Sequence, residues 1–94
     1  RSAARRCLVS ELRVQVDPEL AALRMTARAI PDSRHRSELE GGRFALYAAL
    51  EDDDHDLARR WCRTLRIALA GIEDEKIRVL ASEALDAIEA EVRS

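Results

Sequence analysis

The greatest density of reactive side chains lies at residues 51–56, where five carboxylates and one imidazole occupy six consecutive positions. Asp52 and His55 are three residues apart, so on a helix both would project from one face, as the Glu-x-x-His ligands of carboxylate di-metal centres do. His35 and Glu38 share this spacing in reversed order. The other expected helices offer no core-facing carboxylate to complete a ligand set, so the spacing alone predicts no metal site.

The same acidic stretch is more typical of the start of a helix. Any of the aspartates 52–54 can accept hydrogen bonds from free backbone amides, and the other acids favour the positive end of the helix dipole. An EF-hand loop counted from residue 52 would need Gly and Glu at positions that hold Leu57 and Arg63. We therefore expect residues 51–56 to separate two helices, with His55 exposed, and we predict no metal and no cofactor.

No other residues form a pattern that indicates catalysis. The serines lack a neighbouring base or a nucleophile-elbow motif. Cys7 and Cys62 lie beside apolar residues in expected helices, where a thiol is usually inert packing. Without a geometric constellation of nucleophile, base and electrophile, we predict that the protein is not an enzyme.

The composition favours helices. The 94 residues suffice for one compact domain, 47% are hydrophobic, and only three glycines and two prolines are available for turns. We therefore predict a single all-α domain over residues 1–94, built as a compact bundle of four or five helices. The chain begins with Arg1 rather than Met, and fifteen of its sixteen basic residues are Arg. From this we expect a module of a longer bacterial, cytoplasmic protein, and no apolar run reaches the length of a membrane span.

The periodicity of apolar residues places the helices. Residues 3–16 repeat apolar positions every four residues, although residues 12–16 also alternate as a strand would. Pro18 to Ile30 reads as a second helix, and a short helical turn follows. Gly41-Gly42 either breaks this turn or is tolerated inside a longer helix at a cost of about 1 kcal/mol per glycine. A short apolar helix over 44–50 and two amphipathic helices on either side of Gly71 complete the set. A single bent helix over 54–92, paired in a dimeric bundle, is the alternative. No internal repeat is evident.

The apolar stripes predict the core. Its expected members share the buried face of their helices: Leu8, Leu12, Leu20, Leu23, Ala27, Ile30, Phe44, Tyr47, Leu50, Leu57, Trp61, Leu65, Leu69, Ile77, Leu80, Leu85 and Ile88.

The predicted function rests on the apolar and charged residues that are not assigned to the core. We expect a non-catalytic protein–protein interaction or oligomerisation module that acts by helix-face packing, with a protein partner or a second copy as ligand and a homodimer favoured. Residues 1–47 carry nine Arg against six acids, whereas residues 48–94 carry seven bases against twelve acids. Charge complementarity between an arginine face and the acidic last helix would set the register. The predicted interaction residues are Val9, Val14, Arg59, Arg63, Arg66, Ile67 and Val79.

Two alternatives use other chemistry. A nucleic-acid-binding domain would use Arg59, Arg63 and Arg66 against phosphates, but the preceding acids and the net charge of −2 disfavour it. A small helical metalloprotein would use Asp52 and His55, but the other expected helices offer no core-facing carboxylate to complete the set of ligands.

Overall fold

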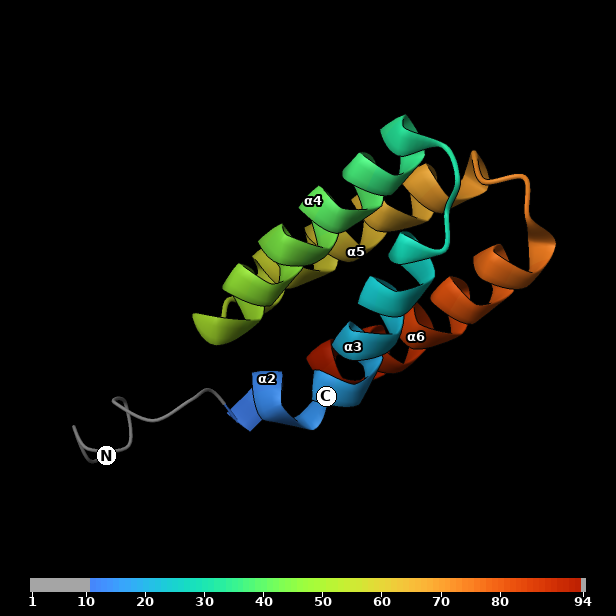
Figure 1. The fold of residues 1–94 in the computed structure, drawn as a ribbon. Coiled ribbons are helices and arrows are strands. Elements are labelled where there is room, and N and C mark those ends of the chain that lie inside the picture. Colours follow the sequence, from blue (N-terminus) through green and yellow to red (C-terminus); the bar gives the residue numbers. More distant parts are fainter. Residues whose placement is uncertain (1–10, 94) are drawn as a thin grey trace, which may run out of the picture.

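A computed structural model describes residues 11–93 as five α-helices joined by short loops (Figure 1). They are α2 (Glu11–Gln15), α3 (Asp17–Arg28), α4 (Ser33–Glu51), α5 (His55–Ala70) and α6 (Glu75–Arg93). No strand occurs in this described range, so the predicted all-α bundle is confirmed. Within the same range, no helix is long and apolar enough to cross a membrane.

The four longer helices form two layers. In Figure 1, α4 and α5 lie side by side in one layer, and α3 and α6 lie side by side in the other. Each helix also contacts the next one along the chain, whereas no Cα atoms of the diagonal pairs α3/α5 and α4/α6 lie within 8 Å of each other. The short α2 packs against α3, α4 and α6. This is the arrangement of an up-down four-helix bundle with one extra turn of helix at its end.

The helix ends decide the alternatives that the sequence left open. Residues 11–15 are helical, so the strand alternative for this segment is wrong. The single bent helix over 54–92 is also wrong, because α5 ends at Ala70 and α6 begins at Glu75. Gly71 terminates α5, and Asp74 accepts a hydrogen bond from the backbone N–H of Ile77 and so starts α6.

Of the two possibilities at Gly41-Gly42, the break is wrong and the longer helix is confirmed, because α4 continues through both residues. Gly42 is buried against α5, and a Cβ atom on it would lie 2.5 Å from Cδ2 of Leu65. The missing side chain therefore lets α4 and α5 approach closely, and the packing gained there offsets the poor helix propensity of glycine, about 1 kcal/mol relative to alanine.

This continuous α4 also corrects the predicted core. With Leu39, Leu46 and Leu50 buried on one side, Phe44 faces solvent and is 66% exposed. Leu57 and Leu80 were also expected inside but are exposed, and Tyr47 and Trp61 are only partly buried. Leu8 and the side chain of Leu12 lie outside the described residues; the other predicted members are buried. The core further contains Val16, Leu39, Leu46, Ala49, Ala58, Cys62, Ile72, Ala81, Ala84 and Val92.

The hairpins α3–α4 and α5–α6 repeat each other 42 residues apart. The helices α4 and α6 have 19 residues each, and each starts one residue after an aspartate, Asp32 or Asp74. Identity between equivalent positions is sparse, which explains why the sequence showed no repeat. The identical pairs are Leu23/Leu65, Arg24/Arg66, Ile30/Ile72, Asp32/Asp74, Arg36/Arg78, Ala45/Ala87 and Ala48/Ala90.

Equivalent hydrogen bonds close the two hairpin turns. Asp32 accepts from the backbone N–H three residues later at 3.1 Å, and Asp74 does the same at 3.2 Å. Nη1 of Arg36 donates to the carbonyl oxygen six residues earlier at 2.9 Å, and that of Arg78 does so at 2.6 Å. Because α4 packs on α5 and α6 packs on α3, the two hairpins are related by an approximate two-fold axis along the bundle.

Candidate interaction surface

The acidic stretch is a helix boundary, as its pattern indicated. Glu51 is the last residue of α4, and its Oε2 accepts from Nε of Arg13 at 2.6 Å. Asp54 caps α5 by accepting from the backbone N–H of Leu57 at 3.1 Å. Asp53 adopts the left-handed conformation, with φ of 54°, where the chain reverses. These roles account for the clustering of acids without a ligand.

His55 is exposed, as expected, but it also makes a structural contact. Its Nδ1 lies 2.9 Å from the carbonyl oxygen of Val92, and since a carbonyl oxygen only accepts, Nδ1 donates. The bond ties the start of α5 to the end of α6. Arg13, at the equivalent position of the other hairpin, ties α2 to the end of α4 through Glu51. Within residues 11–93, no three side chains of His, Cys, Asp and Glu gather in a way that could hold a metal ion.

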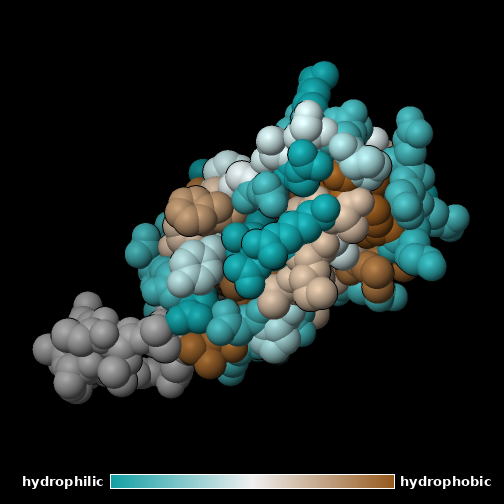
Figure 2. All heavy atoms as spheres, viewed as in Figure 1, coloured by the Kyte–Doolittle hydropathy of each residue, from teal (hydrophilic) through white to brown (hydrophobic). Residues whose placement is uncertain are grey.

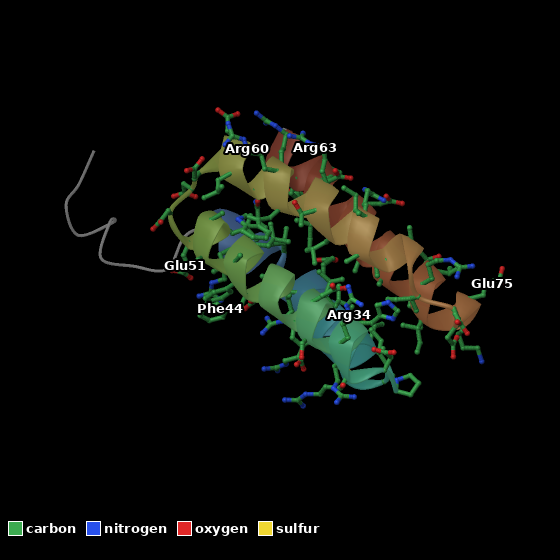
Figure 3. All side chains as sticks on the ribbon, turned by 90° about the horizontal axis from the view of Figure 1, so that it is seen from above. Arg34, Phe44, Glu51, Arg60, Arg63 and Glu75 are labelled. Atoms are coloured by element: carbon green, nitrogen blue, oxygen red, sulfur yellow. The ribbon has the colours of Figure 1, made fainter. Side chains whose placement is uncertain are left out.

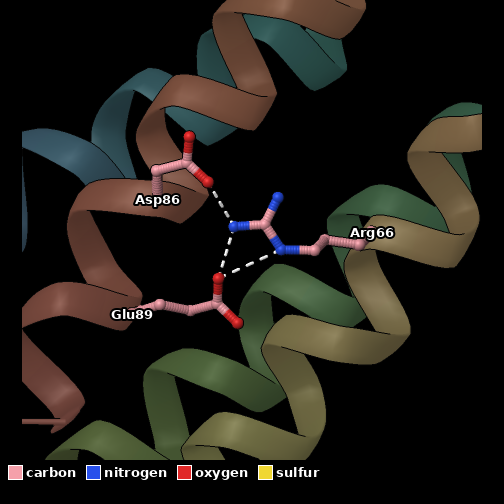
Figure 4. A network of polar contacts seen from close by, with 3 residues as sticks. All are labelled: Arg66, Asp86 and Glu89. Atoms are coloured by element: carbon pink, nitrogen blue, oxygen red, sulfur yellow. Dashed lines mark hydrogen bonds and ion pairs between the residues drawn. The ribbon is translucent and has the colours of Figure 1, made fainter.

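The predicted arginine face does not lie open as a unit, because Arg66 turns toward α6. Its guanidinium contacts Asp86 and Glu89, and Nε donates to Oε1 of Glu89 at 3.0 Å (Figure 4). Hydrogen bonds to Glu89 and then Asp86 raise the pKa of Arg66 above its ordinary value. The predicted pairing of this arginine with the acidic last helix therefore occurs within one chain.

The remaining arginines of the face differ in their surroundings. Arg59 is half-buried and forms an ion pair with Asp56 at the start of α5. Arg63 is exposed, and Figure 3 shows it with Arg60 on the outer edge of α5. The structure thus places two arginines on the outside of α5 and holds two in ion pairs.

The predicted apolar contacts are exposed but separate. Val14 on α2, Ile67 on α5 and Val79 on α6 are 47%, 76% and 45% exposed. Their helix positions place them on outward faces among polar neighbours, where single apolar residues are common. Phe44 is similar, and Figure 3 shows it on the outer side of α4. Val9 lies outside the described residues.

The apolar side chains that the structure does bring together line a groove between α3 and α6. Met25 is 70% exposed and Leu80 is 50% exposed, and both border this groove of about 440 Å³. Figure 2 shows apolar side chains on the face that carries α3, with hydrophilic ones beside them and a long hydrophilic side chain across the middle. The groove is lined by Pro18, Glu19, Ala22, Met25, Thr26, Leu80, Glu83, Ala84 and Ala87. We call it the α3–α6 groove.

The two layers of the bundle differ at equivalent positions. At the position equivalent to Glu19, α5 carries Trp61, which packs against the core. At the position equivalent to Ala84, α4 carries Gly42, which allows the close approach to α5 described above. The α3/α6 layer has neither the large ring nor the glycine, and its surface includes the groove that Met25 and Leu80 border.

A second depression of about 430 Å³ lies between the two hairpin turns, on the approximate two-fold axis. It is lined by Ile30, Pro31, Asp32, His35, Ile72, Glu73 and Asp74. Its aspartates are already used as helix caps, and the backbone N–H of His35 lowers the pKa of the Asp32 carboxyl. The aspartates of this depression therefore serve to begin helices, and we assign it no ligand.

The sequence contained a signal for the α3–α6 groove that the stripe analysis missed. Met25 falls off the buried stripe of α3, and Leu80 was assigned to the core because it lies three residues after Ile77 and four before Ala84 in the apolar stripe of α6. The repeat is the missing information, since it aligns Met25 with the outward-facing Ile67.

No family model, curated protein sequence or solved structure matches the chain. The fold and surface therefore define the chain only as a small all-α bundle domain with an uncovered apolar groove.

Proposed function

We propose that the chain is a non-catalytic protein-interaction or oligomerisation module that works by helix-face packing at the α3–α6 groove. The observation that carries the proposal is the joint exposure of Met25 and Leu80 in one groove. Complete burial of such a side chain contributes about 1.5–3 kcal/mol. A ligand that covers both would gain part of that from each, and a contiguous apolar patch is a common mark of an interaction site.

The small residues of the groove support a helical ligand. Ala22, Ala84 and Ala87 form a shallow channel between two antiparallel helices. An amphipathic helix can lie in such a channel and place its apolar side chains at intervals of three and four residues.

We further propose a cytoplasmic, bacterial setting for this module. The one cysteine in the described residues, Cys62, is buried and free, and burial raises its pKa to about 12, which suits a packing role.

The residues predicted from sequence remain separate candidates. Val14, Ile67 and Val79 are exposed enough to meet a partner, but none lines the α3–α6 groove. The nucleic-acid alternative has less support, because the ion pairs of Arg59 and Arg66 neutralise two of its three cations.

Leu80 and Val79 offer a matched test of the groove. They are neighbours in α6 with similar exposure, 50% and 45%, but only Leu80 lines the groove. Two associations are measured. Self-association of the chain is measured by analytical ultracentrifugation, and any protein that the chain captures is purified and its binding to the chain is measured again. We expect Leu80→Glu to weaken the association by at least about tenfold, as for an interface hot spot, and Val79→Glu to change it by less than about twofold.

Equal losses in the two variants would contradict the groove as the site. A chain that stays monomeric and rebinds no purified partner would contradict the proposed function itself. Circular dichroism melting of both variants checks that the fold is kept, since each substitution lies at an exposed position.

A further inference from the structure

The two ends of the α3–α6 groove differ in the apolar side chains that line them. The large ones, Met25 and Leu80, lie at one end, and the small Pro18 and Ala87 lie at the other, next to the charged Glu19. The order follows from the antiparallel course of α3 and α6. When one copy is turned end over end onto another, the large end of each meets the small end of the other.

Two charged residues of α6 beyond the ends of the groove follow the same polarity. Spacings of three and four residues place Lys76, Leu80, Ala87 and Glu91 along one face of α6. Lys76 lies beyond the large end and Glu91 beyond the small end, and both are exposed. A copy turned end over end would bring the lysine of each chain near the glutamate of the other.

The other two-fold arrangement fits less well. If the axis ran parallel to the helices, α3 of one copy would face α6 of the other with their ends level. Met25 would then meet Leu80 at one end, and the small residues would face each other across a gap at the other. Lys76 would lie near Arg28 of the second copy, a like-charge contact.

We propose that the α3–α6 groove binds the same groove of a second copy of this chain, with α6 antiparallel to α6 about a two-fold axis near residues 83 and 84. Leu80 then packs against Ala87 of the second copy, and Lys76 lies near Glu91 of the second copy. This inference rests on the proposed function and names the partner. It is the isologous, closed arrangement that most homodimers adopt.

The size of the face predicts a weak dimer. The 19 residues of α6 span about 28 Å, and a two-helix layer is about 20 Å wide, so each copy can cover roughly 500 Å². The total of about 1,000 Å² lies at the lower limit for a specific interface. We therefore expect a dissociation constant on the order of micromolar.

Glu83 gives the proposal a signature of opposite sign. It lines the groove next to the proposed axis, so the two copies of this carboxylate approach each other. Like charges at an interface oppose association. Glu83→Gln removes both charges and keeps the side-chain size, so it should strengthen the dimer by about threefold to tenfold.

Disulfide trapping tests the geometry directly. Leu80 and Ala87 are seven residues apart on one helix, about 10 Å, which is too far for a disulfide within the chain. With Cys7→Ser as background, Leu80→Cys/Ala87→Cys should form covalent dimers under mild oxidation. The single variant Leu80→Cys should form few covalent dimers, because the two cysteines of such a dimer are about 10 Å apart along the direction of α6. Buried Cys62, with its raised pKa, does not compete.

A charge swap in sedimentation experiments completes the test. Lys76→Glu or Glu91→Lys alone should weaken the dimer about threefold to tenfold, and the double variant should restore it, because the opposite charges again face each other. A monomer at millimolar concentration, or trapping in Leu80→Cys alone, would overturn the antiparallel dimer. If such a monomer still binds a purified partner through Leu80, the proposed function stands and only the second copy is excluded.

Discussion

The α3–α4 and α5–α6 hairpins have the same plan but differ in what they do with their outer positions. In α5–α6, Arg66 is held by Asp86 and Glu89 of the facing helix. The equivalent arginine in α3–α4 is Arg24, which is exposed, and the positions equivalent to the two acids hold Phe44 and Tyr47. The α5–α6 hairpin therefore joins its helices through an arginine of its own, whereas Arg13 of α2 joins Asp17 of α3 to Glu51 of α4 in the other hairpin.

The layers differ in a complementary way. The α4/α5 layer carries Gly42 and Trp61, and the α3/α6 layer carries Ala84 and Glu19 in the equivalent places. The comparison teaches that exposure alone does not single out a site, because Ile67 is as exposed as Met25 but only Met25 lines the α3–α6 groove.

The largest predicted effect concerns the equivalent buried leucines, Leu23 and Leu65. Both are almost completely buried in one continuous core, so Leu23→Ala and Leu65→Ala should each lower the free energy of unfolding by about 3 kcal/mol. Urea denaturation should show a single transition in both variants, and Ile67→Ala at the surface should change stability by less than about 0.5 kcal/mol. Two separate transitions would show that the hairpins fold independently and would break the comparison.

The second prediction sharpens the contrast between the layers. Gly42→Ala places a Cβ atom against the buried Leu65, so it should lower stability by about 1–2 kcal/mol despite the better helix propensity of alanine. Gly41→Ala is the control, since no atom lies within 4 Å of the added Cβ, and it should raise stability by about 1 kcal/mol. Thermal melting measures both, and equal stabilisation in the two variants would mean that α4 and α5 are not closely packed there.

The third prediction compares Arg66 with Arg24. Arg66→Ala should lower stability by about 1 kcal/mol because it leaves Glu89 half-buried without this partner, whereas Arg24→Ala should change it by less than about 0.5 kcal/mol. The loss in Arg66→Ala should shrink in 1 M salt, which screens partly exposed ion pairs. Equal effects from the two arginines in urea denaturation would contradict the assigned network.

The smallest prediction concerns the pH dependence of the first hairpin turn. The N–H of His35 lowers the pKa of Asp32 in the folded state, so this cap stabilises the fold above the unfolded pKa of about 4. Its contribution is lost as the pH falls through the lowered, folded pKa. Asp32→Asn keeps a capping oxygen but cannot titrate, so its stability should vary less than that of the wild type below about pH 4. Identical acid denaturation curves would contradict the assignment.

Much of the fold follows from local sequence, and its failures have physical causes. The helix class, the Asp54 boundary and most core stripes were predicted because capping and periodicity act over a few residues. The continuity of α4 was left open beside a break, because the contact that decides it comes from Leu65, more than twenty residues away from Gly42. Phe44 was misplaced for the same reason, since breaking α4 shifts the apparent apolar face.

The candidate surface was less accessible to sequence reasoning. The arginine face was expected to meet the acidic last helix across an interface, but the structure pairs Arg66 with Asp86 and Glu89 of its own chain, which sequence alone does not distinguish. The α3–α6 groove depends on how α3 and α6 pack against each other, which the separate apolar stripes do not specify.

The most direct test of this account is sedimentation equilibrium of Met25→Glu beside Ile67→Glu. The two residues occupy equivalent positions in the repeat, are 70% and 76% exposed, and differ in that Met25 lines the α3–α6 groove. We predict that the wild type and Ile67→Glu dimerise with similar dissociation constants, and that Met25→Glu stays monomeric at least tenfold above that concentration. Loss of the dimer in Ile67→Glu with retention in Met25→Glu would contradict the groove and favour the outer face of α5.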